Sequence, residues 1–257
     1  MKKNLNNARD IYLARKSLAK AMESTFGVKQ LIKKPLTLKL LDVGCGFGST
    51  TILAKRDGFD VYALDIDKRQ LLWEQDRKSR LGINLFVADG QALTFPDETF
   101  DVVYSCHALE HIPDDSKVLL EIYRVLKQDG IFLLSIPNGF NLSTQFNSKI
   151  KRQNAFISKE HLREYDRHTI NGRLDKIGFY TLDLCMSGFL LPLGNSIFNL
   201  IVLQCNLQRI KDYLASKFPE SSESIDIVAI KKENRHKDEF QLQRWDRIFP
   251  LPWWLKK

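Results

Sequence analysis

The sequence has few cysteines and no long hydrophobic run. Its four cysteines are widely spaced, at Cys45, Cys106, Cys185 and Cys205. This spacing contains no CxxC pair, which excludes a dense disulfide framework and a cysteine-rich zinc site. No stretch of about 18 apolar residues is present, so a membrane-spanning helix is not expected. The basic N-terminus lacks the apolar segment of a secretory signal, and we therefore expect a cytoplasmic protein.

Acidic residues are outnumbered by basic ones. The chain has 39 Lys and Arg against 31 Asp and Glu, a net charge of +8. This balance favours an anionic partner such as nucleic acid, a membrane surface or a phosphorylated substrate, although a solvated basic surface explains it equally well. With 257 residues and 44% hydrophobic side chains, the chain is long and apolar enough for a full core.

Strand and helix patterns alternate between residues 36 and 138. Strand patterns occupy 36–44, 60–67, 83–90, 100–106 and 130–138, and helical patterns occupy 49–58, 68–82 and 115–130. Such alternation predicts right-handed βαβ units and a parallel sheet covered on both faces. The continuous apolar character of the strands agrees with burial on both sides. We therefore expect an α/β, Rossmann-like, doubly wound fold.

The remaining sequence predicts three further parts. Residues 1–37 form a helical appendage, because apolar residues from Ile11 to Phe26 recur at helical spacing. The main domain, 38–234, contains a helix at 168–179, strands at 179–186 and 224–233, and lid-like insertions at 139–167 and 189–222. Residues 235–257 form a basic tail in which Trp253 and Trp254 adjoin two lysines. This tail suits an anionic membrane surface, or else packs on the core or on a second subunit of a homodimer.

A glycine-rich turn lies between the first strand and the first helix of the main domain. Its sequence is Asp42-Val43-Gly44-Cys45-Gly46-Phe47-Gly48. Glycines let the backbone approach a ligand closely, and doubly wound folds hold nucleotide-like ligands at this place. Ser49 stands where a dinucleotide-binding fingerprint requires Gly or Ala, which argues against a dinucleotide.

Acidic residues mark the ends of the first three strands. Asp42 precedes the glycines and suits a cationic group such as an ammonium. Asp65 ends the second strand, where a carboxylate accepts from ribose hydroxyls, and Asp89 ends the third, where it can accept from an adenine amino group. We expect these three acids to surround one crevice.

Residues 38–180 resemble the class I S-adenosylmethionine-dependent methyltransferases, and among them the bacterial small-molecule subgroup that includes the ubiquinone-type enzymes. The matching segments are LLDVGCGFGSTT (40–51), the acid in VYALDID (61–67), VADGQALTFPDETFDVVYSCHALEHI (87–112), GIFLLSIPN (130–138), EHLREY (160–165) and LDKIGF (174–179). The resemblance implies a seven-stranded sheet, mostly parallel with the last strand antiparallel. It also implies S-adenosyl-L-methionine as cofactor and S-adenosyl-L-homocysteine as product.

The resemblance implies roles for individual residues. The loop that holds the methionine part matches Asp42, Gly44, Gly46 and Gly48, with Cys45 as a small apolar filler. The ribose and adenine positions match Asp65, Ile66, Asp89, Gly90, Gln91 and Ala92, and the backbone at the end of the fourth strand matches Ser105 and Cys106.

Two histidines are candidates for catalysis. A hydroxyl nucleophile needs a base with a pKa near neutrality, and His111 and His161 fall in family segments near the transfer site. The alternative is that each is a hydrogen-bonded wall residue. His107 and His111 are four residues apart with Glu110 between them, but the order is not HExxH, so the sequence predicts no metal site.

The methyl acceptor is less well specified. Enzymes that methylate exocyclic amino groups carry an Asn/Asp-Pro-Pro-aromatic motif after the fourth strand, and this chain has Ser105-Cys106-His107-Ala108 instead. We therefore expect transfer to a small, lipid-linked or glycan-linked acceptor, with oxygen as the favoured atom. The alternatives are an RNA methyltransferase, which the missing motif opposes, and a cofactor-binding module without activity.

Overall fold

The computed structural model describes residues 38–56, 58–141, 160–189, 214 and 217–231. The expected appendage at 1–37, the tail at 235–257 and most of both insertions lie outside the described residues. Among the described residues, no helix is long and apolar enough to cross a membrane.

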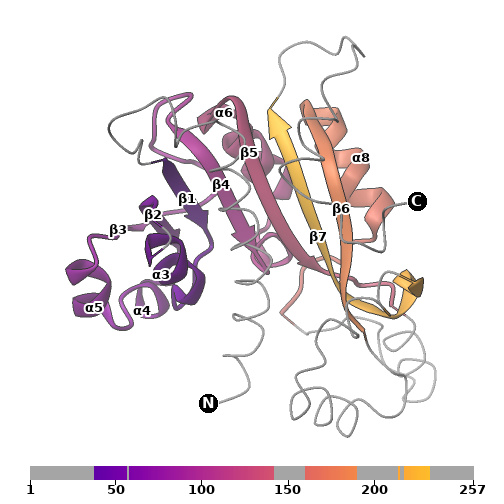
Figure 1. Cartoon of the computed structure of the whole chain (residues 1–257), viewed down its shortest axis with the longest axis horizontal. Helices are drawn as coiled ribbons and strands as arrows, with labels where there is room; N and C mark the ends of the chain where they lie inside the picture. Colours follow the sequence, from indigo (N-terminus) through magenta and orange to yellow (C-terminus); the bar gives the residue numbers. More distant parts are fainter. Residues whose placement is uncertain (1–37, 57, 142–159, 190–213, 215–216, 232–257) are drawn as a thin grey trace, which may run out of the picture.

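The described strands form one seven-stranded sheet in the order β3-β2-β1-β4-β5-β7-β6 (Figure 1). The strands are β1 (Lys39–Val43), β2 (Asp60–Asp65), β3 (Asn84–Val87), β4 (Phe100–Cys106), β5 (Leu126–Pro137), β6 (Phe179–Phe189) and β7 (Ser222–Lys231). Only β7 runs against its neighbours in this sheet: it pairs antiparallel with both β5 and β6, whereas the other pairs are parallel. The expected mostly parallel sheet with an antiparallel last strand is confirmed.

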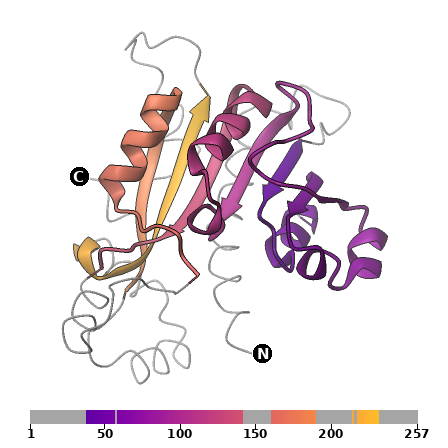
Figure 2. The same ribbon diagram turned by 180° about the vertical axis from the view of Figure 1, so that it is seen from behind.

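Helices cover the sheet on both faces. The helices are α3 (Ser49–Arg56), α4 (Lys68–Leu71), α5 (Gln75–Arg80), α6 (Asp115–Val125) and α8 (Arg167–Ile177), with 3-10 turns η1 (Leu109–His111) and η2 (Pro219–Ser221). Seen from behind, α6 and α8 lie side by side in front of the sheet (Figure 2). One buried apolar cluster joins this helix pair to the strands, and a second cluster contains Ile52 of α3. The sheet is therefore the middle layer, as expected of a doubly wound fold.

The prediction of one continuous helix over 68–82 is wrong. The chain breaks at Glu74, whose φ is +53°, and forms the short helices α4 and α5. The break frees the carbonyl of Leu71 from the helical pattern, and the buried ammonium of Lys78 donates to it at 2.7 Å. A side-chain hydrogen bond from a residue seven positions along the chain therefore satisfies this carbonyl.

The helix expected over 115–130 is shorter than predicted. It ends at Val125, and β5 begins at the next residue. The carbonyls of Arg124 and Val125 accept from the backbone N–H groups of Glu98 and Thr99, at 3.1 and 2.8 Å. The residues just before β4 thus donate hydrogen bonds to two of the carbonyls that the end of the helix leaves without intrahelical partners.

Residues 160–166, the described end of the insertion at 139–167, are anchored to the core. Tyr165 is buried, and its hydroxyl donates to Asp115 at the start of α6, at 2.7 Å. The backbone N–H of Leu162 donates to the carbonyl of Glu110 at 2.9 Å. Arg163 donates to the carbonyls of Ile112 and Pro113. These contacts bring a segment 50 residues away in sequence against the chain that follows β4.

Candidate functional site

The glycine-rich turn after β1 has a backbone that other residues adopt only with strain. Gly44, Gly46 and Gly48 have φ values of +72°, +51° and +75°. A Cβ on Gly44 would lie 2.3 Å from the Cβ of Ala108. Both the left-handed conformation and this close approach require glycine. The turn therefore touches the residues that follow β4, and the ends of β1 and β4 meet here.

Two predicted acids hold this turn in place. Asp42 is buried and accepts from the hydroxyl of Thr51 in α3 at 2.6 Å. Asp65 accepts from the backbone N–H of Gly46 at 2.7 Å and from that of Asp67 at 2.8 Å. These carboxylates connect the turn to the first helix and to the end of β2. A carboxylate has about four acceptor sites, so Asp65 retains acceptor capacity beside these two bonds.

The third acid lies on the loop after β3. Asp89 accepts from the backbone N–H of Gln91 at 2.9 Å and from its side-chain amide. The carbonyl oxygen of the same amide accepts from the N–H of Asp114 at 3.0 Å, which ties the loop to the start of α6. Gly90 is buried against Val43, and Ala92 is exposed.

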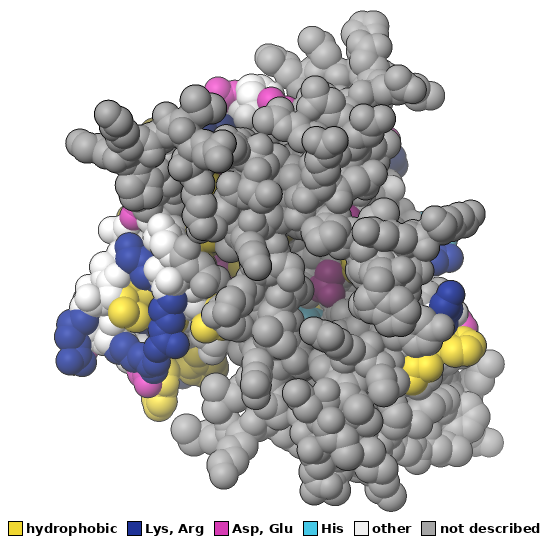
Figure 3. Space-filling view, viewed as in Figure 1, with side chains coloured by type: hydrophobic (Ala, Val, Ile, Leu, Met, Phe, Trp, Pro, Cys, Tyr) yellow, Lys and Arg dark blue, Asp and Glu magenta, His cyan; other side chains and the backbone are white. Residues whose placement is uncertain are grey.

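Exposed apolar and basic side chains adjoin this edge of the sheet. Ile66 is 71% exposed, and the half-exposed rings of Phe47 and Trp73 meet edge to face with centroids 6.1 Å apart. Basic side chains gather around α4 and α5 (Figure 3), where the exposed residues are Lys68, Arg69, Arg77 and Arg80. The sequence analysis missed the Phe47–Trp73 pair, because its two rings come from separate elements.

Lys78 lies beneath the glycine-rich turn, and the sequence analysis did not identify it. Its side chain is fully buried, with Cε 2.8 Å from the position of a Cβ on Gly48. Burial lowers the pKa of Lys78, while the charges around it, including Asp42 and Asp65, act in the opposite direction. Lys78 follows the buried Leu71 by seven residues, and this helical spacing was the available signal.

Burial also raises the pKa of the Cys45 thiol, and the neighbouring charges of Asp42 and Asp65 raise it further. The thiol therefore stays protonated and unreactive at neutral pH. This agrees with the predicted role of Cys45 as a small filler in the turn.

The end of β4 leads from the glycine-rich turn to the histidines. Ser105 is buried, and its hydroxyl has no hydrogen-bond partner among the described residues. Cys106 is half-buried, and His107 has a φ of +48° while its N–H donates to the carbonyl of Ser135 at 2.8 Å. This left-handed residue turns the chain from β4 into η1, which places Glu110 and His111 beside the turn.

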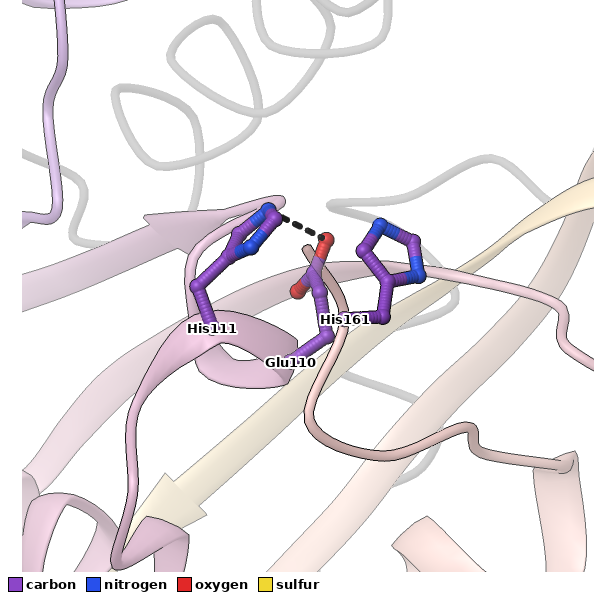
Figure 4. A group of neighbouring side chains, drawn as sticks. All are labelled: Glu110, His111 and His161. Carbon is purple, nitrogen blue, oxygen red and sulfur yellow. Dashed lines mark ion pairs between the residues drawn. The ribbon is translucent and has the colours of Figure 1, made fainter. Parts of the chain in front are cut away.

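The structure brings the two candidate catalytic histidines together. The rings of His111 and His161 meet edge to face with centroids 5.0 Å apart. Figure 4 shows the carboxylate of Glu110 between them. One ligand atom from each of Glu110, His111 and His161 lies within 4.8 Å of the others. His161 is carried by the anchored segment at 160–166, so its position depends on contacts that no local pattern specifies.

His107 also lies close to this carboxylate. Its Nδ1 lies 3.6 Å from Oε1 of Glu110. Burial lowers the pKa of His107, but the interaction with Glu110, together with the charges of Asp226 and Glu223, outweighs burial and raises it overall. The cluster therefore combines imidazoles with a buried acid.

Comparison with known proteins identifies the domain. Residues 41–134 match the family model described as "Methyltransferase domain". The solved "SAM dependent methyltransferase from Archaeoglobus fulgidus" has the same fold, with a TM-score of 0.57, 18% identity and 82% of both chains covered. The chain contains a class I S-adenosylmethionine-dependent methyltransferase domain.

Curated relatives of this methyltransferase domain have names that refer to quinone chemistry. The chain is 35% identical over 134 residues to the 2-methyl-6-phytyl-1,4-hydroquinone methyltransferase of Synechocystis, covering 50% of this chain and 40% of that protein. It is 30% identical over 165 residues to the ubiquinone/menaquinone biosynthesis C-methyltransferase UbiE of Marinomonas, covering 54% and 65%. The chain thus spans less than two thirds of either relative.

The residues at the strand ends of the methyltransferase domain fit its cofactor, S-adenosylmethionine. Carboxylates after β2 and β3 supply acceptors for hydroxyl and amino groups, and the turn after β1 allows close backbone approach. The buried hydroxyl of Ser105, which has no partner among the described residues, adds an unused polar atom at the end of β4.

Proposed function

We propose that this protein transfers a methyl group from S-adenosylmethionine to a hydroxyl-bearing small molecule. One observation carries the proposal: Ala108, which abuts Gly44 of the glycine-rich turn, lies only three residues before His111. The predicted cofactor turn and the histidine pair thus lie next to one another in the methyltransferase domain. Alignment of a methyl donor with an acceptor is the main contribution that such a site makes.

In this proposal, residues at the ends of different strands bind different parts of the cofactor. Asp65 accepts from the ribose hydroxyls and Asp89 from the adenine amino group, with Gly90, Gln91 and Ala92 along the adenine edge. Ile66 is exposed enough to cover one adenine face. The turn from Asp42 to Gly48, with Cys45 inside it, holds the methionine part, and the backbone of Ser105 and Cys106 faces the same ligand.

The acceptor is proposed to carry an ionisable hydroxyl, as a hydroquinone does. The names of the curated relatives support this class. The sulfonium of the cofactor supplies the methyl group. An imidazole Nε2 of His111 or His161 accepts the hydroxyl proton, and the oxygen forms the new bond to carbon as the sulfur–carbon bond breaks. Oxygen remains the proposed target, although loss of the same proton also activates the ring carbon beside it.

The ends of the chain carry a second part of the proposal. Residues 1–37 would add a helical appendage to the domain at 38–234, and the tail at 235–257 would contact anionic membrane weakly. The Trp- and Lys-rich sequence of the tail supports this contact. Such a contact would bring the enzyme to a lipid-linked acceptor. Co-sedimentation with anionic vesicles at low salt tests it, and no binding by the whole chain would remove it.

The test of the main proposal has two steps. Calorimetry with S-adenosylhomocysteine should show binding in the low-micromolar range or tighter. Labelled cofactor should then transfer its methyl group to a short-chain hydroquinone, and mass spectrometry identifies the methylated atom. Binding without transfer to any lysate fraction would support the binding-module alternative, and label in RNA would support the nucleic-acid alternative.

A further inference from the structure

We propose that Glu110, His111 and His161 form a binding site for one divalent transition-metal ion. The proposal goes beyond methyl transfer, because metal binding can be measured without any reaction. It revises the sequence-based prediction of no metal site, which rested on the absence of an HExxH order. The three residues come from η1 and from the segment at 160–166, which lie together only in the folded chain (Figure 4).

The carboxylate of Glu110 is the first argument for a bound cation. Its side chain is 1% exposed, and neither oxygen accepts a hydrogen bond from any described residue. The approaching groups are Nδ1 of His107 at 3.6 Å and Nε2 of His111 at 3.9 Å, which is ion-pair range and too long for hydrogen bonds. A buried carboxylate without hydrogen bonds is costly. A metal ion between the carboxylate and the imidazoles would supply the missing interaction.

The orientation of the two imidazoles is the second argument. Nδ1 of His111 lies 3.1 Å from the carbonyl oxygen of Glu160, which can only accept, so this nitrogen carries the proton. Nδ1 of His161 lies 3.2 Å from Oε1 of Glu164 and donates to that carboxylate. In both rings Nε2 is then the nitrogen with a free lone pair. Donation of the other ring N–H to a carbonyl or carboxylate is the usual way in which proteins orient histidine ligands.

The ligand set indicates the kind of metal. Two imidazole nitrogens and one carboxylate oxygen suit zinc, iron or manganese, whereas magnesium and calcium prefer oxygen ligands alone. Tetrahedral zinc with bonds of about 2.0–2.1 Å needs ligand atoms roughly 3.3 Å apart. The ligand atoms lie within 4.8 Å of one another, and Nε2 of His111 is 3.9 Å from Oε1 of Glu110, so the three side chains would have to move closer together to close the site.

Three protein ligands leave coordination positions open. His111 is 39% exposed, so these positions are reachable from solvent. A hydroxyl that binds there would ionise more readily, because a metal ion lowers the pKa of its bound oxygen. This consequence rests on the proposed function, whereas the metal site itself does not.

The experiment measures metal binding by the whole chain. Protein stripped with EDTA is titrated with Co²⁺, followed by visible absorption, and with Zn²⁺, followed by calorimetry. We expect one ion per chain and a Co²⁺ spectrum typical of nitrogen and oxygen ligands. Glu110→Gln and His161→Gln should each weaken affinity at least tenfold. His168→Gln, which removes an exposed histidine outside the cluster, should leave affinity unchanged.

Two further measurements make the result decisive. S-adenosylhomocysteine affinity, measured without metal, should be unchanged in Glu110→Gln if the fold is intact. His111→Gln, at a more exposed position, replaces it as the deciding variant if Glu110→Gln does not fold. No metal binding by the wild type, or equal binding by the cluster variants and His168→Gln, would overturn the proposal. A failure to bind S-adenosylhomocysteine would instead contradict the proposed function.

Discussion

The glycine-rich turn and the histidine cluster lie side by side at one edge of the sheet, but their acids are satisfied differently. Around the turn, Asp42 and Asp65 accept hydrogen bonds at 2.6 and 2.7 Å from Thr51 and Gly46. In the cluster, Glu110, which is as buried as Asp42, accepts none from the described residues. The first region is held together by hydrogen bonds between its own polar groups, whereas in the second the carboxylate has imidazoles only at ion-pair distance, 3.6 and 3.9 Å away. This contrast separates a preformed scaffold from a site that a ligand would complete.

The two regions also differ in the sequence distance of their hydrogen bonds. Asp42 binds a residue nine positions away and Asp89 binds one two positions away. His111 contacts Glu160, 49 positions away. Substitutions in the turn should therefore disturb the fold or the cofactor, and substitutions in the cluster should disturb transfer. Four predictions test this difference.

Replacement of Gly44 should have the largest effect. In Gly44→Ala the new Cβ meets Ala108 and forces a non-glycine residue to a φ of +72°. We expect a loss of about 2–4 kcal/mol in the free energy of unfolding, measured with urea, and weaker S-adenosylhomocysteine binding. The control is Gly172→Ala in α8, where nothing lies within 4 Å and a gain of up to about 1 kcal/mol is expected. Equal stability of the two variants would contradict the close contact.

Removal of either candidate catalytic histidine should act on turnover. We expect His111→Ala and His161→Ala to lower turnover at least roughly 100-fold with a hydroxyl acceptor, because the acceptor proton loses its base or metal. Affinity for S-adenosylhomocysteine should stay within about twofold, since neither ring belongs to the turn. His168→Ala is the control with normal kinetics. Normal turnover in both cluster variants would show that these histidines line the site without taking part in catalysis.

Loss of the Asp65 carboxylate should weaken cofactor binding. Asp65→Ala removes the proposed ribose acceptor and the bond to Gly46, so we expect about 1–3 kcal/mol weaker binding by calorimetry. Asp101→Ala is a matched control at the opposite end of the sheet. That carboxylate also accepts from a backbone N–H, that of Lys39 at 2.9 Å, and from Lys127 at 2.7 Å. If both variants bind the cofactor equally, Asp65 stabilises the glycine-rich turn and does not bind the ribose.

The smallest effect should come from Asp166, which caps α8 directly after the segment of His161. Burial would raise the pKa of Asp166, but hydrogen bonds from Thr169 and His168 outweigh it and lower the pKa. The ionised cap therefore stabilises the fold above about pH 4 and loses its effect as the pH falls through the lowered pKa.

Asp166→Ala should accordingly reduce the free energy of unfolding by about 1 kcal/mol at pH 7. Urea titrations at decreasing pH should show the difference from wild type shrinking. A difference that does not change with pH would mean that packing, and not the charge of the cap, stabilises this end of α8.

Local patterns were sufficient for the strands and for the turn after β1. The strand over 100–106 has its predicted bounds, and the glycines at 44, 46 and 48 all occupy left-handed conformations. The helix over 68–82 was mispredicted because the chain breaks at Glu74, where the buried Lys78 donates to the carbonyl of Leu71. The spacing of Lys78 from Leu71 hints that Lys78 is buried, but it does not show that the lysine binds a backbone carbonyl at a break in the helix.

The sequence by itself determined the layered α/β fold and the row of acids at the strand ends, because both follow from short-range periodicity and from the parallel direction of the strands. Only the tertiary structure decided that His161 meets Glu110 and His111. That meeting depends on the bonds of Leu162 to Glu110 and of Tyr165 to Asp115, which join segments about 50 residues apart. Contacts at such distances leave no repeating pattern in the chain, because the contacting residues come from separate elements that only the tertiary fold brings together.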